Sequence, residues 1–166
     1  MKKVFVFVLL MLLVAGPSFA AGSCVQTTKT SYTAQDRVPD AYGVIVTLTC
    51  TADSGGAFPS TTVLMVPSSA VTSPWNLYDY YLYQVGRTPG TTQPTGSYTV
   101  TITDSRGFAL DLGLLTSNGS ASAAQLTGIY NTTTVYPVVR SNLTVAITGN
   151  SVNAAQITLD LLFKAQ

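Results

Sequence analysis

The sequence contains no histidine and no glutamate. Without histidine, the chain lacks the most common general base in catalysis and one of the usual zinc ligands. All seven acidic residues are aspartates, and they never occur in the Asp-x-Asp spacing of a calcium-binding loop. We therefore predict a protein that is not an enzyme and that binds no metal ion and no cofactor.

Aspartates alone could still form the acid and base pair of a glycoside hydrolase. The candidates are Asp53, Asp104 and Asp111, which lie beside glycine in turn-like sequence or on a short strand. Aspartate favours turns because its carboxylate accepts hydrogen bonds from nearby backbone N–H groups. We assign the three residues to turns, and a secreted aspartate-dependent hydrolase remains only a hypothesis to test.

Charge is also scarce, since only 9% of the residues are charged and the net charge is +1. Two of the eight basic residues, Lys2 and Lys3, belong to a leader that we expect to be removed. The rest of the chain then has six basic residues against seven acidic ones. This balance predicts no binding to nucleic acid or to an anionic membrane surface.

The first twenty residues have the three parts of a secretory signal peptide. Basic residues follow Met1, the run Val4–Ala15 is apolar, and Ser18–Ala20 fits a small-x-small cleavage site. We predict cleavage after residue 20 and export to the periplasm, the cell surface or the medium. One alternative is an uncleaved membrane anchor, although such an anchor needs about 20 apolar residues. Another is a lipoprotein modified at Cys24, although the usual leucine three residues earlier is missing.

Residues 21–166 have the length of one domain, and they contain both cysteines, Cys24 and Cys50. A β-hairpin with its apex at Arg37 would place these two residues opposite each other. Opposed residues have Cα atoms about 4.5 to 5.5 Å apart, a distance that a disulfide can span. Export also favours oxidation. We predict a Cys24–Cys50 disulfide, with two buried free thiols as the alternative.

Residues that favour β-structure dominate this domain, where threonine alone occupies 25 positions. Apolar and polar residues alternate in four segments, 44–50, 97–103, 142–148 and 157–164, with turn residues between them. A period of two indicates strands that bury one face. We predict an all-β protein with a single antiparallel β-sandwich-like domain over residues 21–166. Residues 120–126 are the one candidate for a short helix.

The stretch WNLYDYYLY, residues 75–83, places aromatic residues at both parities of an expected strand. One interpretation is a central strand that is covered on both sides. The other is a surface for protein contacts or for stacking against sugars, because Tyr and Trp bury a large area at low entropic cost. The candidate contact residues are Trp75, Tyr78, Tyr80, Tyr81 and Tyr83.

The segment RTPGTTQPTGSYTVTITDSRG, residues 87–107, combines a Pro/Gly loop, an alternating strand and an Asp-x-x-Gly turn. It resembles a motif of small β-rich structural proteins in the virions of tailed bacteriophages and prophages. The residues that match are Pro89, Gly90, Pro94, Thr95, Tyr98, Thr101, Thr103, Asp104 and Gly107. Residues 46–58 and 142–163 are similar to the opening segment and the closing hairpin of that family. The leader is a departure, since those virion proteins need no signal peptide.

The resemblance implies a structural protein that assembles with copies of itself or with a larger particle, in a virion or on a cell surface. The alternative function is a secreted adhesin or carbohydrate-binding module, with a glycan as the ligand of the same aromatic residues. Contact with a membrane is expected only through an uncleaved leader.

Overall fold

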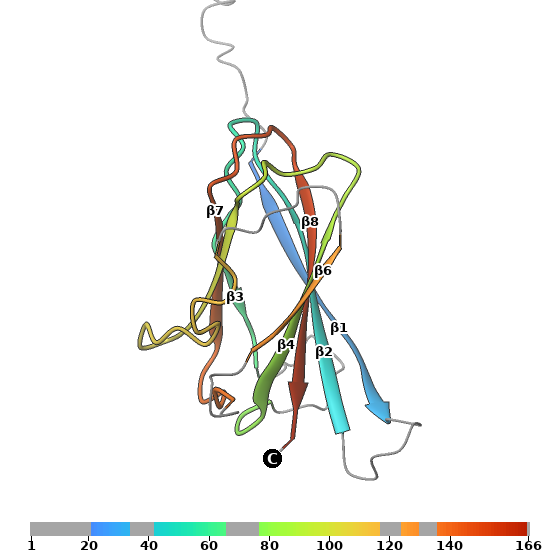
Figure 1. The fold of residues 1–166 in the computed structure, drawn as a ribbon, viewed down its shortest axis with the longest axis vertical. Helices are drawn as coiled ribbons and strands as arrows, with labels where there is room; N and C mark the ends of the chain where they lie inside the picture. Colours follow the sequence, from blue (N-terminus) through green and yellow to red (C-terminus); the bar gives the residue numbers. More distant parts are fainter. Residues whose placement is uncertain (1–20, 34–41, 66–76, 117–123, 130–135, 166) are drawn as a thin grey trace, which may run out of the picture.

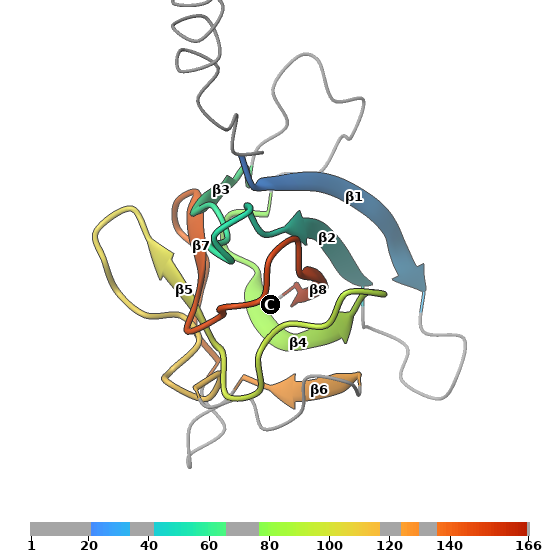
Figure 2. The ribbon, with the colours of Figure 1, turned by 90° about the horizontal axis from the view of Figure 1, so that it is seen from above.

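The computed structural model describes residues 21–33, 42–65, 77–116, 124–129 and 136–165, which form two antiparallel β-sheets (Figures 1 and 2). The five-stranded sheet has the order β1 (Ser23–Thr33), β2 (Tyr42–Thr51), β8 (Gln156–Lys164), β4 (Tyr81–Pro89) and β6 (Gln125–Gly128). The three-stranded sheet has the order β3 (Thr61–Val63), β7 (Leu143–Thr148) and β5 (Thr99–Asp104). The predicted all-β fold is confirmed.

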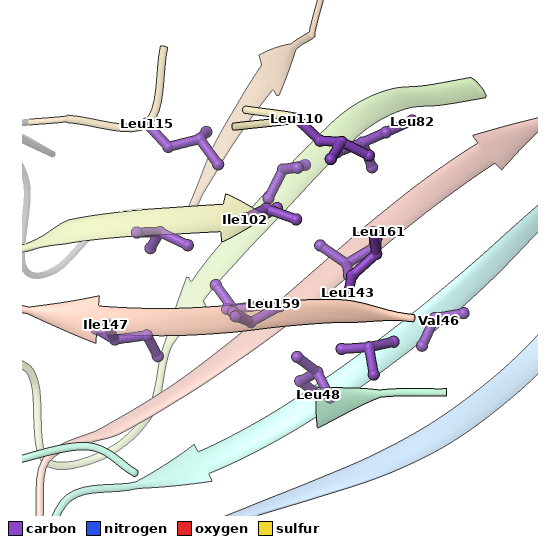
Figure 3. Close-up of a cluster of buried hydrophobic side chains, with 14 of the residues drawn as sticks. Val46, Leu48, Leu82, Ile102, Leu110, Leu115, Leu143, Ile147, Leu159 and Leu161 are labelled. Carbon is purple, nitrogen blue, oxygen red and sulfur yellow. The ribbon is translucent and has the colours of Figure 1, made fainter. Parts of the chain in front are cut away.

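The hydrophobic core lies between the two sheets, where side chains from both inner faces meet (Figure 3). It is built from the alternating residues that the sequence pattern indicated. Along β8, for example, Ile157, Leu159, Leu161 and Phe163 are all buried while the residues between them are half-buried. β7 alternates in the same way from Leu143 to Ile147. Each strand therefore contributes one apolar face to a shared core, as expected for packed sheets.

The first two strands form the hairpin predicted from the cysteine positions. Cys24 lies opposite Cys50 in the register of β1 and β2, and a disulfide joins them with their Cα atoms 4.0 Å apart. The register shifts between Lys29 and Ser31, which leaves Ser23–Lys29 as the regular part of β1. The disulfide prediction is confirmed, and a disulfide is typical of proteins in an oxidising compartment.

Residues 46–58, 87–107 and 142–163 meet at one end of the domain. The side chain of Asn150 accepts a hydrogen bond from the backbone N–H of Thr95 at 2.8 Å. The same amide donates to the carbonyl oxygens of Gly56 and Val152. Asn150 thus joins the loop before β5, the turn after β2 and the turn between β7 and β8. These motif residues act here as scaffold, because the bonds are made within the chain.

The aromatic stretch from residue 75 to residue 83 is not one strand, and this part of the prediction is wrong. β4 begins only at Tyr81. Just before it, Asp79 has a φ of 68°, and the backbone N–H of Tyr80 bonds to the carbonyl of Leu77. A left-handed φ is incompatible with a continuing strand, and aspartate tolerates it better than most residues. Residues 77–80 therefore form a turn before the strand begins.

The short helix expected over residues 120–126 is also wrong where it can be tested. Gln125 and Leu126 belong to β6, which pairs with β4, and the described part of the chain contains no helix. Pairing with an existing sheet edge has overridden the local helix preference. Residues 120–123, the predicted leader at residues 1–20 and Trp75 lie outside the described residues.

Candidate functional site

Three tyrosines gather at the start of β4 and define what we call the tyrosine cluster: Tyr81, Tyr83 and Tyr136. The ring centroid of Tyr136 lies 6.1 Å from that of Tyr81 and 5.1 Å from that of Tyr83. The Nζ atom of Lys164 sits 3.5 Å from the centroid of the Tyr83 ring, within the range of a cation–π contact. All four side chains are half-buried, so each retains an accessible part.

The geometry of β4 explains why both of its cluster tyrosines turn away from the core. Leu82, between them, is completely buried, so its neighbours point to the outer face of the five-stranded sheet. The register with β8 then shifts between Leu82 and Gln84, which leaves Tyr83 as the extra residue of a bulge. Bulges re-aim side chains and are frequent near functional sites.

Backbone contacts from two other segments hold the cluster in place. Tyr81 lies opposite Lys164 in the register of β4 and β8. It also forms an isolated bridge with Val138, and the N–H of Leu82 bonds to the carbonyl of Pro137 at 3.1 Å. These bonds bring Tyr136, at the start of that segment, beside β4. The site therefore combines residues that are far apart in the sequence.

The five predicted contact residues separate into different environments. Tyr78 and Tyr80 are partly buried and pack against the hydrophobic core, whereas Tyr81 and Tyr83 belong to the cluster. Trp75 lies outside the described residues. Sequence reasoning missed Tyr136 and Lys164, because neither belongs to the aromatic stretch and only the sheet pairing brings them to it.

The aspartates considered as an acid and base pair each serve a turn. Asp53 accepts hydrogen bonds from the backbone N–H groups of Gly55 and Ala57, both at 2.8 Å. Asp111 is buried and accepts from the N–H groups of Ile102 and Gly113. Such bonds are the reason why aspartate favours turns. Among the described residues, no group of three His, Cys, Asp or Glu side chains could hold a metal ion.

Asp104 combines a turn with an ion pair at the end of β5. Its carboxylate accepts bonds from the N–H groups of Arg106 and Phe108, both at 2.9 Å, and pairs with the Arg106 guanidinium at 2.8 Å. Burial on its own would raise the pKa of Asp104. The hydrogen bonds from Phe108 and Arg106, together with the charge of Arg106, outweigh it and lower the pKa below its ordinary value.

This lowered pKa predicts a loss of stability in acid. A carboxyl whose pKa is lower in the folded state stabilises the fold above its unfolded pKa of about 3.9, and this contribution disappears as the pH falls through the folded pKa. We expect the wild type to be more stable than Asp104→Asn at pH 7 and to lose that advantage below about pH 4. Urea unfolding of both proteins from pH 7 to pH 2 measures the difference. A difference that is constant with pH would contradict the assignment.

Arg87 is the most unusual polar residue of the described core. It lies on β4 with 5% of its surface exposed, and its Nη2 atom donates to the Thr127 hydroxyl at 2.8 Å. Its Nε and Nη1 atoms are buried and have no hydrogen-bond partner. Burial lowers the pKa of the guanidinium, and the nearby Tyr98 acts in the opposite direction. Arg87 faces the interior and is therefore not part of the tyrosine cluster.

The tyrosine cluster places half-buried aromatic rings, hydroxyl groups and one cation together beside the first residues of β4. Such a surface is suited to packing against another protein or against a sugar ring. Comparison of the chain with protein-family models, with curated proteins and with solved structures finds no match. The resemblance to phage virion proteins therefore rests on the sequence motif alone.

Proposed function

We propose that this protein is a non-enzymatic structural component that assembles through protein–protein contacts. It acts in a phage-virion-like particle or as an exported component of a cell surface. The observation that carries the proposal is the tyrosine cluster, in which Tyr81, Tyr83 and Tyr136 lie together on the outer face of the five-stranded sheet. Aromatic residues are enriched at the centres of protein interfaces.

Two further features support this role. The buried side chains of the described residues are mostly apolar, and Arg87 is the one buried basic residue among them. Such a core suits a structural domain. The Cys24–Cys50 disulfide supports a location in an oxidising compartment, such as the periplasm, the cell surface or the medium. Disulfides also occur on virion surfaces, so the same observation fits both settings.

The tyrosine cluster provides the test. We expect Tyr81→Ala and Tyr83→Ala to weaken self-association or binding to a particle by about tenfold or more, since interface hot spots cost at least about 1 to 2 kcal/mol. The melting temperature should change by only a few degrees, because both side chains are half-buried on the outer face. Sedimentation velocity and thermal melting of each variant measure the two effects separately.

Tyr78→Ala and Tyr80→Ala are matched controls from the same stretch. Both side chains pack against the core, so their truncation should lower the free energy of unfolding by about 1 to 3 kcal/mol. Association of the folded fraction should be unchanged. If all four variants are destabilised alike and none affects association selectively, the tyrosines are structural and the contact site is wrong.

The alternative function is a secreted adhesin or carbohydrate-binding module. The feature that favours it is a cation within the cluster: the Lys164 Nζ atom lies over one face of the Tyr83 ring, 3.5 Å from its centroid, next to the rings of Tyr81 and Tyr136. An aromatic face flanked by a hydrogen-bond donor can stack against a sugar and bond to its hydroxyls. Titration with a panel of soluble neutral oligosaccharides, followed by tyrosine fluorescence, separates the two functions. Saturable binding that Tyr83→Ala abolishes would favour the module.

A further inference from the structure

The edge of the three-stranded sheet at β5 is closed by the chain itself. In this strand the N–H groups of Val100, Ile102 and Asp104 point away from β7. The N–H of Val100 donates to the Leu115 carbonyl at 3.1 Å, and the N–H of Asp104 donates to the Phe108 carbonyl at 3.0 Å. The N–H of Ile102 donates to the Asp111 carboxylate at 3.1 Å. Unpaired edge groups attract strands from other chains, and natural proteins cover them. The 108–115 segment provides that cover here.

The β1 edge of the five-stranded sheet differs from the β5 edge. β1 has 11 residues and pairs with β2, whereas the other outer strands, β5, β6 and β3, have six, four and three residues. Figure 2 shows β1 as the outermost long strand on its side of the domain. Within the described residues, no backbone hydrogen bond from outside the β1–β2 ladder reaches the regular part of β1.

The register identifies which groups face outward from β1. The N–H of Ala52 bonds to the carbonyl of Ala155, which extends the β2–β8 ladder, so the even-numbered residues of β2 bond to β8. Cys50 is one of them, so its pair with Cys24 is a non-hydrogen-bonded pair on the β1 side. The Cα separation of 4.0 Å agrees with this assignment. By alternation, the backbone groups of Cys24, Gln26 and Thr28 point away from β2.

The regular part of β1 is also held in position on its inner side. The Gln26 side chain donates to the Leu64 carbonyl at 3.2 Å and accepts from the Leu64 N–H at 3.1 Å. The disulfide fixes Cys24. The segment Ser23–Lys29 contains no proline, and its only charge is at its last residue, where the register shift also begins. It therefore presents a strand backbone with few of the features that block strand addition.

We propose that β1 pairs antiparallel with β1 of a second copy of this chain, about a two-fold axis at Gln26. This pairing joins the two five-stranded sheets edge to edge. This pairing specifies a second copy as the partner and β1 as the contact strand for the assembly proposed above, and it rests on that proposed function. The occupant is a second copy because the segment is self-complementary: with Gln26 opposite Gln26, all seven residues Ser23–Lys29 pair before the bulge begins.

Charge does not oppose this pairing. In the Gln26-centred arrangement position 29 of each copy lies opposite Ser23 of the second copy, so the two lysines are not paired with each other. Like charges directly opposite each other destabilise a strand pair. Val25 lies opposite Thr27 of the second copy on the outer face, where Val25 is 58% exposed. Moving the axis to Val25 or to Thr27 shortens the regular pairing or extends it into the bulge.

Cysteine cross-linking tests the pairing and its register. Val25 and Thr27 of opposite copies form a non-hydrogen-bonded pair with Cα atoms about 4.5 Å apart, within reach of a disulfide. We expect the full chain carrying Val25→Cys and Thr27→Cys together to form a covalent dimer in glutathione buffer, with most of the protein cross-linked. Peptide mapping should join position 25 of one copy to position 27 of the other and find Cys24–Cys50 intact.

The single variants are the register controls. A covalent dimer of Val25→Cys alone, or of Thr27→Cys alone, would place the axis at that residue and overturn the Gln26 register. If none of the three variants cross-links, β1 does not pair with itself and the proposal is wrong.

Removing one outward donor tests the role of the backbone. Gln26→Pro removes an N–H that points away from β2, and proline is tolerated at such edge positions. Gln26→Ala is the matched control, because it loses the same side-chain bonds to Leu64 but keeps the N–H. In sedimentation velocity we expect Gln26→Pro to raise the dimer dissociation constant at least tenfold above that of Gln26→Ala. Equal constants for the two variants would contradict the proposal.

The same cross-link separates this inference from the proposed role of the tyrosine cluster. We expect the Val25→Cys and Thr27→Cys pair to cross-link equally well when Tyr81→Ala is added, since the two surfaces lie on different strands. A cross-link that persists while Tyr81→Ala and Tyr83→Ala leave association unchanged would overturn the cluster alone. Loss of association in the tyrosine variants without any cross-link would overturn the β1 pairing alone.

Discussion

Removal of the Cys24–Cys50 disulfide should lower the free energy of unfolding by about 2 to 4 kcal/mol. The bond joins residues 26 positions apart, so it closes a loop that the unfolded chain would otherwise explore freely. It also ties an outer strand to the body of the sheet, because β1 is paired only with β2 among the described strands. Urea unfolding of Cys24→Ala/Cys50→Ala, compared with the oxidised wild type, measures the loss.

Reduced wild type is the control for this experiment. It lacks the bond but keeps both sulfur atoms, so its difference from the double variant reports the packing of the buried Cys50 side chain. Hydrogen exchange should show the largest loss of protection at the β1–β2 ladder, where the link acts directly. Equal stability of the oxidised and reduced wild type would mean that the β1–β2 contacts alone define the hairpin.

Replacement of Arg87 by methionine should raise the free energy of unfolding by about 1 to 3 kcal/mol. The guanidinium is almost fully buried, and two of its three nitrogen atoms have no hydrogen-bond partner. Burying a charged group with two unpaired donor nitrogens is costly, and its single bond to Thr127 offsets only part of that cost. Methionine keeps an unbranched apolar stem of similar length and carries no donors.

Arg87→Lys is the matched control, since it retains the charge but loses the planar arrangement of donors. We expect no gain in stability from lysine, and a loss if the bond to Thr127 matters. Chemical denaturation of the three proteins at one pH gives the comparison. A less stable Arg87→Met protein would show that the interactions of the guanidinium in the core, including the one with Tyr98, exceed its desolvation cost.

The strands that bury one face could be predicted from the sequence because their physics is local. The alternation of apolar and polar residues in 44–50 and 157–164 predicts which side chains face the core. These segments form β2 and β8. The cysteine pair was predictable for a related reason. If the two strands form a hairpin with its apex at Arg37, counting along the chain places Cys24 opposite Cys50, whereas the register shift between Lys29 and Ser31 could not be counted in advance.

The aromatic stretch could not be interpreted by the same rule. Alternation before Tyr81 suggested a strand, but Asp79 adopts a left-handed φ and ends it. Residues 125 and 126 failed in the same way, since pairing with β4 decided their conformation. In both places a long-range contact or a single backbone angle outweighed local preference, and neither leaves a periodic signal.

The sequence by itself determined the all-β class, the inward faces of the main strands and the disulfide, because each depends on spacing along one or two neighbouring strands. Only the tertiary structure decided what surrounds each group. Sheet pairing brings Tyr136 and Lys164 to Tyr83, buries two nitrogen atoms of Arg87 without hydrogen-bond partners, and closes the β5 edge with the 108–115 segment. The edge of β1 has no such closure among the described residues. These are contacts between distant segments, and the energy that selects them belongs to the packed domain as a whole.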